Sequence, residues 1–475
     1  MSNTTNIRIY NIICCLCGLI GFFFCFVVES GDPHIPGYYL LPLSFALFHI
    51  AFQKAFKYEF GIGVLLFEAV AFFRYIIAPV ITCVVHKYDG HIWSVQSTYF
   101  EAVIYMVVEL FTSYCVMYFM IPYVKRKSKY EIQEIELGKF GVIKFLVVVY
   151  WLYIVIASPT MREMMFNFTL SSSDINTSYL LSDYRSTIPN EYIMFYYIGL
   201  VIVYVEGLKL IQNNRYLNRW MKIIVIALLS VLYMSCGWTD GNSVSRGGML
   251  VAVLAMVYVL LYFFPEKKKI IVTVGVIVVV VAIIVGTFFK RVSHGMDISV
   301  WESIMTYVTP SYMNEYFTGV FPVANGIDVV KTVSESRFTT FLFDTVANIP
   351  KLLSTLGITG ESSATFFGTC THHIELIIPS AAMSYFVFGE FGTWIYNAII
   401  VYFLIVTQTR MKIAKSLYTR LLLFQIMFWC SLTMAINIQI IQANCWKYVV
   451  GIVIMCLDDK FVIRAFSNRK KRGER

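Results

Sequence analysis

Arg246 lies in the stretch GNSVSRGGML, where its surroundings suggest a binding role. The apolar run that follows it ends in the lysines of FFPEKKK. Lysines at one end of a membrane helix are typical of the cytoplasmic side, so Arg246 is expected at the opposite end, where orientation rules ask for no positive charge. A helix start is already positive, and an arginine added there is favourable when an anion is bound. Gly247 and Gly248 would let that anion approach the backbone closely. This pattern predicts a phosphate or diphosphate site.

Two alternatives remain open for Arg246. Its side chain could reach lipid headgroups, or it could pair with Asp240. Three more basic residues are expected on the same side of the membrane, and each alone suits a headgroup contact: Lys290, Arg291 and Arg337. Together with Arg246 they could line one anionic site, but the sequence does not show that they converge.

His372 and His373, in CTHHIE, are candidates for proton transfer, because histidine is the natural acid–base group at neutral pH. Neighbouring histidines cannot both aim at one ion with the further ligands that zinc needs, so no metal site is expected there. A plain structural histidine is the competing interpretation. The CxxC spacing of Cys14 and Cys17 lacks a second pair or a nearby histidine, and no metal or redox site is expected there either.

The composition identifies the setting in which these residues act. Of the 475 residues, 58% are hydrophobic and only 14% are charged, whereas a soluble domain carries about 25% charged residues. The chain is therefore predicted to be an all-α polytopic membrane protein. Its net charge of +9 does not indicate a nucleic-acid partner, because the basic residues cluster in short loops and in the tail, as orientation and anionic lipids require.

Apolar runs of about 17–25 residues alternate with polar breaks and predict about twelve membrane helices in a single integral membrane domain, residues 1–475. The first run lacks a convincing cleavage site and is read as a retained helix. The predicted helices are 9–28, 37–53, 59–85, 98–122, 139–158, 192–208, 221–237, 248–264, 270–289, 391–408, 418–440 and 443–457.

Lysine and arginine predict the orientation. With the N-terminus inside, every second loop is cytoplasmic and each of these loops is basic, as is the C-terminal tail RAFSNRKKRGER. Both termini are therefore predicted inside. The outer side then has a moderate loop, residues 159–191, and a large one, residues 290–390.

The large outer loop is rich in aromatic and apolar residues and is expected to fold into short helices on the outer face. Within it, the segment Ile377 to Phe388 is apolar but too short to span, and it predicts a re-entrant or interfacial helix. Gly389 and Gly392 follow, and then a spanning helix.

Four charged residues fall inside predicted membrane helices: Glu68, Arg74, Glu109 and Glu206. Each is costly unless it is paired or faces water. Glu68 and Arg74 are six residues apart, which does not place them on one helix face. Their partners must therefore come from other helices, which the sequence does not identify.

Taken together, these features resemble the Wzy-type O-antigen and capsule repeat-unit polymerases, which are related to the O-antigen ligases. The resemblance covers most of the chain in topology. It rests on short motifs: Ser245-Arg246-Gly247, Lys290-Arg291 after the ninth helix, and His373 with Pro379, Ser380 and Gly389-Glu390-Phe391-Gly392. This chain departs from the family in its additional His372 and in its modest loop 159–191.

The resemblance implies a reaction at the outer face of a bacterial inner or plasma membrane. A glycan on undecaprenyl diphosphate is transferred to a sugar hydroxyl of another lipid-linked repeat unit, in a metal-free, inverting step without a cofactor. His373 is expected to act as the base, with His372 second, while Arg246 and Arg291 stabilise the departing diphosphate. Arg337, Lys290, His372, Gly247 and Gly248 are expected to bind the substrate. The expected partners are the lipid-linked donor and acceptor, membrane lipid and a chain-length regulator.

Three other functions remain open. A flippase or other transporter of lipid-linked oligosaccharides would also be basic and polytopic, but it should place its charged residues in a central cavity on several helices. A ligase-like transferase would use the same donor with another acceptor. A receptor or structural protein would need neither Arg246 nor the histidines. The concentration of reactive residue types on one outer loop favours an enzyme.

Overall fold

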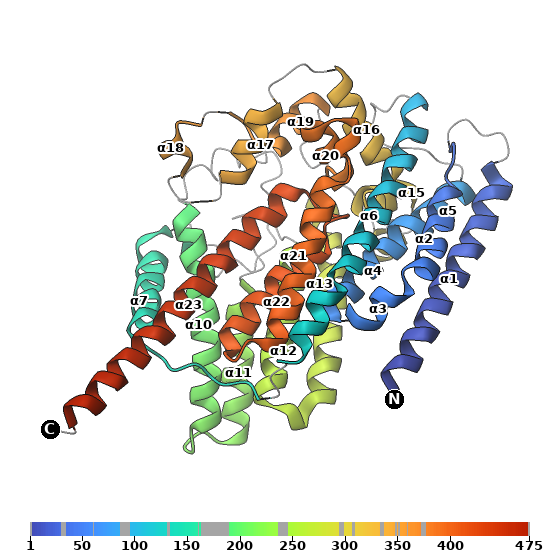
Figure 1. Cartoon of the computed structure of the whole chain (residues 1–475). Coiled ribbons are helices and arrows are strands. Elements are labelled where there is room, and N and C mark those ends of the chain that lie inside the picture. The colour runs from blue at the N-terminus through green and yellow to red at the C-terminus, as the bar shows by residue number, and fades with distance from the viewer. Residues whose placement is uncertain are drawn as a thin grey trace. The chain divides into compact units, whose positions relative to one another are not determined.

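The computed structural model describes most of the chain (Figure 1). The described residues are 2–29, 35–59, 61–85, 96–130, 134–159, 161–162, 190–235, 246–293, 299–305, 309–332, 337–346, 349, 352–358, 360–371 and 377–473. They form helices and connecting turns, with one isolated β-bridge between Glu136 and Ser416. The prediction of an all-helical chain is confirmed for these residues.

Six helical segments of the described chain are long and apolar enough to cross a membrane, and the protein is therefore treated as membrane-embedded. These segments are Ile7–Val28, Ile62–Val85, Thr98–Ser128, Glu191–Asn213, Glu390–Ile413 and Ile438–Lys460. Each coincides with one of the twelve predicted helices.

The other six predicted helices are also helical, but they are not established as spans. Three are apolar and shorter: Leu40–Ala51, Val142–Ala157 and Leu417–Ser431. At about 1.5 Å per residue, the 12 residues of Leu40–Ala51 reach about 18 Å, short of a hydrocarbon core of about 30 Å. Two more, Gly248–Phe263 and Pro265–Val281, are long and apolar enough to span only when they are taken together, and the pair is bent by 119°. The sixth is Arg219–Met234. The count of twelve spans remains a prediction.

The chain divides into two compact units. Unit 1 comprises residues 1–132, 305–413 and 426–446, and unit 2 comprises residues 133–304, 414–425 and 447–475. The helices of unit 1 are α1 (Ser2–Glu29), α2 (Leu40–Ala51), α3 (Gln53–Glu59), α4 (Ile62–Phe72), η1 (Phe73–Ile77), α5 (Ala78–Val85), α6 (Gln96–Ser128), α15 (Pro310–Tyr316), α16 (Val320–Thr332), α17 (Arg337–Val346), α18 (Leu352–Leu356), α19 (Ser363–Thr371), α20 (Ser380–Phe388), η6 (Glu390–Gly392) and α21 (Ile395–Ile413).

Unit 2 contains α7 (Val142–Ala157), α10 (Asn190–Asn213), α11 (Arg219–Met234), α12 (Arg246–Phe263), η4 (Pro265–Lys267), α13 (Lys268–Ser293) and nearly all of α14 (Val300–Met305). The boundary between the units runs within α22 (Leu417–Ser431) and α23 (Ile438–Gly473).

The large loop forms the short helices that its composition predicts. They run from α14 to α20, and the predicted re-entrant or interfacial segment becomes α20. Residues 380–386 of α20 are buried, and Tyr396 at the start of α21 donates its backbone N–H to Ser384 at 3.1 Å. Gly389 ends α20 with φ of +74°, a conformation that favours glycine, so the GEFG turn depends on this residue.

Unit 1 has two chemically distinct ends. At one end Lys125 of α6 lies over the Tyr58 ring and Lys54 lies over the Tyr118 ring. We call this the basic end. Toward the other end, α16 packs along the first turns of α6, where Thr98 donates to Asp328 at 2.5 Å. In Figure 1 the N-terminus of α1 lies away from α16, α19 and α20. This arrangement agrees with the predicted pattern of basic inner loops and a folded outer loop.

Unit 2 also has a cluster of basic residues at one end. Gln212 of α10 donates to the Phe263 carbonyl of α12 at 3.1 Å, so the turn after α10 lies beside the turn after α12. These two turns and the helix starts that follow carry Lys209, Arg215, Arg219, Lys267, Lys268 and Lys269. Arg246 begins α12 at its other end.

A topology test follows from this arrangement. Cys370 in α19, which is partly exposed, is expected to react with a membrane-impermeant thiol reagent in whole cells, in a background from which the other cysteines are removed. A cysteine placed at the exposed Lys267 in the same background is the matched control and is expected to stay unlabelled until the membrane is opened. Labelling of the control in intact cells would overturn the predicted orientation.

Candidate functional site

Arg246 is the first residue of α12 (Arg246–Phe263). Gly248 in the same first turn is buried. Lys290 and Arg291 belong to the last turns of α13, and Arg337 begins α17. For Arg246, Lys290, Arg291 and Arg337 the structure describes only the backbone. It therefore does not test whether their side chains converge on one anion. His372 and His373 lie outside the described residues.

The structure does reveal the partners of the charged residues inside the membrane helices. Arg74 of η1 and Glu109 of α6 form an ion pair, with 2.9 Å between Nη2 and Oε2. Both side chains are completely buried. Arg74 also donates from Nη1 to the Met434 carbonyl at 3.0 Å. A buried charge that lost its partner here would be strongly destabilising, so each residue requires the other.

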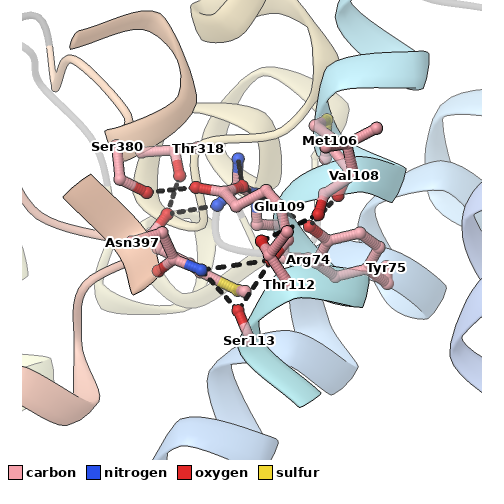
Figure 2. A network of polar contacts seen from close by, with 11 residues as sticks. Arg74, Tyr75, Met106, Val108, Glu109, Thr112, Ser113, Thr318, Ser380 and Asn397 are labelled. Carbon is pink, nitrogen blue, oxygen red and sulfur yellow. Dashed lines mark hydrogen bonds and ion pairs between the residues drawn. The ribbon is translucent and has the colours of Figure 1, made fainter. Parts of the chain in front are cut away.

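Glu109 joins this ion pair to the helices of the large loop (Figure 2). Its other carboxylate oxygen, Oε1, accepts a short hydrogen bond from the Ser380 hydroxyl at the first residue of α20. Asn397 in the first turn of α21 donates to the Glu109 carbonyl at 3.2 Å and to the Ser113 hydroxyl. The helix after the histidine pair is thus fixed at its first residue to α6. We call these residues the Arg74–Glu109 network.

Two irregular backbone segments, the turn at Thr318 and the turn that contains Met434, meet at the Arg74–Glu109 network. Thr318, between α15 and α16, has φ of +46°, which is unusual for a β-branched residue. Its hydroxyl donates to the Met434 carbonyl, the same oxygen that accepts from Arg74. Such strain costs on the order of 1–3 kcal/mol and persists where the surrounding structure requires it, often at functional sites.

Arg74 and Tyr75 belong to a π-helical turn, Phe73–Ile77, inside an otherwise α-helical span. Tyr75 donates to the Met106 carbonyl at 2.7 Å and lies 3.4 Å from Glu109. Turns of this kind are rare and occur frequently at functional sites. Both side chains are buried, so the turn directs two consecutive polar residues toward α6.

The depth of the network follows from the geometry of α6. Glu109 precedes Lys125 by sixteen residues, or about 24 Å at about 1.5 Å per residue. A hydrocarbon core is about 30 Å thick. With Lys125 at one membrane surface, the Arg74–Glu109 network lies near the opposite surface, below the helices of the large loop.

The Arg74–Glu109 network positions other side chains and helices and is not itself a reactive site. Both carboxylate oxygens of Glu109 are engaged, and neither Glu109 nor Arg74 is exposed. No group of three histidine, cysteine, aspartate or glutamate side chains that could hold a metal ion occurs among the described residues. The network holds the start of α20 and of α21 at a fixed depth, and Ser380 follows His373 by seven residues in the sequence.

The comparisons with known proteins found no match. This holds for family models, for curated proteins and for solved structures. The resemblance to the repeat-unit polymerases therefore rests on the motifs and topology of this sequence, and the argument for function rests on the residues themselves.

A second cluster of titratable residues lies deeper in unit 1. His49 of α2 places Nε2 3.1 Å from Glu68 Oε2 on α4, and Tyr114 of α6 donates to the same oxygen at 3.0 Å. Asn11 of α1 places Oδ1 3.4 Å from His49 Nδ1. Tyr114 precedes Lys125 by eleven residues, about 16 Å along α6, which puts this cluster near the middle of a core of about 30 Å.

Asp344 is a carboxylate of the large loop with a raised pKa. It is buried in α17 and accepts the backbone N–H of Ser363 at 3.1 Å. Burial raises its pKa to about 6, although the hydrogen bonds from Ser363 act in the opposite direction. In contrast, the backbone and side-chain hydrogen bonds from Ser299 lower the pKa of the exposed Glu302.

Several of these residues are not singled out by the sequence: His49, Tyr75, Tyr114, Asn397 and Thr318. Glu68 and Glu109 show through their charge within apolar runs, but their partners carry no comparable signal. A tyrosine, an asparagine or a threonine in a membrane helix is common. Only the packing of the helices identifies these residues as members of polar clusters.

Proposed function

We propose that the protein is a membrane glycosyltransferase that polymerises repeat units carried on a lipid diphosphate. The observation that carries the proposal is the unit formed by α20, the GEFG turn and α21. A short buried helix follows the histidine pair, is fixed to α6 through Ser380 and Glu109, and turns at Gly389 into a spanning helix. This is the part of the chain on which the resemblance to the polymerases most depends.

The proposed step is a glycosyl transfer. A hydroxyl oxygen of the acceptor sugar bonds to the anomeric carbon of the donor, and the bond between that carbon and the diphosphate oxygen breaks. The electron pair of the broken bond leaves with the lipid diphosphate, and the hydroxyl proton passes to His373. Charge grows on the departing diphosphate, and Arg246 at the start of α12 stabilises that charge together with Arg291.

The direct test uses purified protein in lipid nanodiscs with a lipid-diphosphate-linked repeat unit. Products longer than one repeat are expected without nucleotide sugar and in the presence of a metal chelator. A ligase-like transferase would leave the repeat units unextended and transfer them only to a different acceptor. Absence of any transfer to either acceptor would contradict the proposal.

Arg246→Ala is expected to reduce chain growth at least about a hundredfold, because removing one donor to developing negative charge costs about 10²–10³ in rate. Arg246→Lys is expected to restore only part of the activity, since lysine lacks the two-pronged guanidinium. Polymer ladders on a gel, with the protein level checked by blot, provide the measurement.

The matched control is Arg219→Ala. Arg219 also begins a helix of unit 2, α11, but at the end of that unit that carries Lys209 and Lys267, where no lipid diphosphate is expected. This variant should give a wild-type ladder. Full polymer from Arg246→Ala, or equal losses from both variants, would remove the anion site from the proposal.

A second candidate function is transport of the lipid-linked oligosaccharide. The observation that favours it is the His49–Glu68–Tyr114 cluster, because titratable residues near the membrane centre are typical of proton-coupled transporters. Uptake of a fluorescent lipid-linked sugar into proteoliposomes that depends on a pH gradient would support this function. Chain growth without a gradient would support the polymerase.

A further inference from the structure

The contacts of His49 depend on the number of protons that its cluster holds. Nδ1 faces the Asn11 carbonyl oxygen at 3.4 Å, and Nε2 faces Glu68 Oε2 at 3.1 Å. An amide oxygen only accepts hydrogen bonds, so Nδ1 carries a proton in this arrangement. The remaining question is whether a second proton lies between Nε2 and Glu68.

Two arrangements with that second proton satisfy every contact. In one, His49 is an imidazolium that donates to both Asn11 and an ionised Glu68. In the other, a protonated Glu68 donates to Nε2 of a neutral His49. Both leave the pair without net charge, and Tyr114 donates to Glu68 Oε2 at 3.0 Å in either case.

Without the second proton the pair carries one negative charge. His49 then has a single ring proton, and to keep the contact with Glu68 it must place that proton on Nε2. Nδ1 becomes an acceptor that faces the Asn11 oxygen, which is unfavourable. Rotation of the Asn11 amide by a half turn removes the conflict, because Asn11 Nδ2 is buried and makes no hydrogen bond to the described residues.

The surroundings favour the neutral pair. The helices packed around it contribute Tyr10 and Cys14 from α1, Phe56 from α3 and Tyr114 from α6. Tyrosine and cysteine are ordinarily uncharged at neutral pH. No cation other than His49 itself faces Glu68 among these described neighbours. An unbalanced negative charge is costly at this depth of a membrane.

From this geometry we propose that His49 and Glu68 form a binding site for one proton near the membrane centre, in which Asn11 is the rotatable amide that satisfies His49 whether or not the proton is bound. The site lies in helices α1, α2, α4 and α6, apart from the residues assigned to glycosyl transfer. The proposal therefore holds or fails independently of the reaction.

The test counts the proton spectroscopically in protein reconstituted in lipid nanodiscs. The chain has 7 histidines, and a variant with the other six changed to glutamine leaves His49 as the sole histidine without altering the site. Nitrogen NMR of isotope-labelled His49 distinguishes an imidazolium from either neutral tautomer. Infrared difference spectra between this protein and its Glu68→Gln form reveal a protonated Glu68 by its carbonyl stretch.

At neutral pH we expect either an imidazolium, or a neutral imidazole together with a carboxylic-acid band that disappears in Glu68→Gln. Either result shows one bound proton. Raising the pH should remove that signal and move the ring proton to Nε2. A neutral imidazole with no carboxylic-acid band at neutral pH would overturn the proposal.

Two variants refine the test. Glu68→Gln has no charge to hold a second proton, so its His49 is expected to be neutral at neutral pH, and an unchanged imidazolium there would overturn the proposal. Tyr114→Phe is the matched control, because it removes a hydrogen bond to the same oxygen but no titrating group of the pair. It is expected to keep the bound proton, and loss of that proton would contradict assignment to His49 and Glu68.

Discussion

Arg74→Met is expected to lower the free energy of unfolding by about 3–5 kcal/mol, because it leaves Glu109 as an unpaired charge in a buried site. The Arg74–Glu109 pair is completely buried, and no solvent reaches the carboxylate to replace the guanidinium. Unfolding in mixed detergent micelles, together with the level of membrane-inserted protein, measures the effect.

The double variant Arg74→Met with Glu109→Leu is expected to recover most of this loss. Replacing both members of a buried pair by apolar residues of similar size is often neutral or stabilising, whereas removing one member is not. If the double variant has the same loss of unfolding free energy as Arg74→Met, the ion pair is not the source of the effect.

The control is Lys331→Met, which breaks the ion pair between Lys331 and Glu101. In that pair 45% of the lysine side chain and 25% of the glutamate side chain are exposed. A pair open to solvent is worth about 0–1 kcal/mol, so this variant should be close to wild type. Equal effects of Lys331→Met and Arg74→Met would contradict the argument from burial.

The double variant also separates stability from function. It lacks the carboxylate that accepts the Ser380 hydroxyl, so α20 loses this hydrogen bond to α6. A folded double variant should therefore make little polymer under the proposed function. Wild-type polymer from this variant would mean that the position of α20 does not matter for chain growth.

The positions of the helices could be predicted from the sequence because a membrane helix is encoded by a continuous apolar run. Their ends were less accurate. The run predicted as helix 418–440 ends at Ser431, and a turn precedes α23, which begins at Ile438. This turn places the Met434 carbonyl against Arg74 and Thr318. Apolar residues occupy the turn, so hydropathy does not distinguish it from helix.

The partners of the buried charges could not be predicted from the sequence. Glu68 and Arg74 were correctly expected to need partners from other helices, but Glu109 lies thirty-five residues beyond Arg74 and His49 lies nineteen before Glu68. Which helices pack together, and at what rotation, determines these pairs. At the predicted anion site, the structure shows only that Arg246 begins a helix. The binding of an anion there remains a prediction.

His373→Ala is expected to slow chain growth by about 10²–10⁴, the usual contribution of a general base, with donor binding near normal. His372→Ala is expected to be milder and to act through the folding or position of the loop. The reason is directional, since neighbouring residues in a helical turn point about 100° apart and only one can face the acceptor hydroxyl. The resemblance to the repeat-unit polymerases, through the spacing from His373 to Pro379 and to the GEFG turn, is the reason for proposing His373 for the role.

Polymer length on a gel for each single variant, with protein level checked by blot, provides the comparison. Each histidine is the matched control of the other, because both belong to the same segment before α20. A stronger loss in His372→Ala would exchange their roles. Wild-type ladders from both would remove histidine from the mechanism.

The base would then be sought among Glu302, Glu315, Asp344 and Glu375. Of the two whose side chains the structure describes, Asp344 suits the role better, since burial raises its pKa to about 6 whereas the pKa of Glu302 is lowered. Asp344 is almost inaccessible at 2% exposure, so the structure would have to open before it could reach the acceptor.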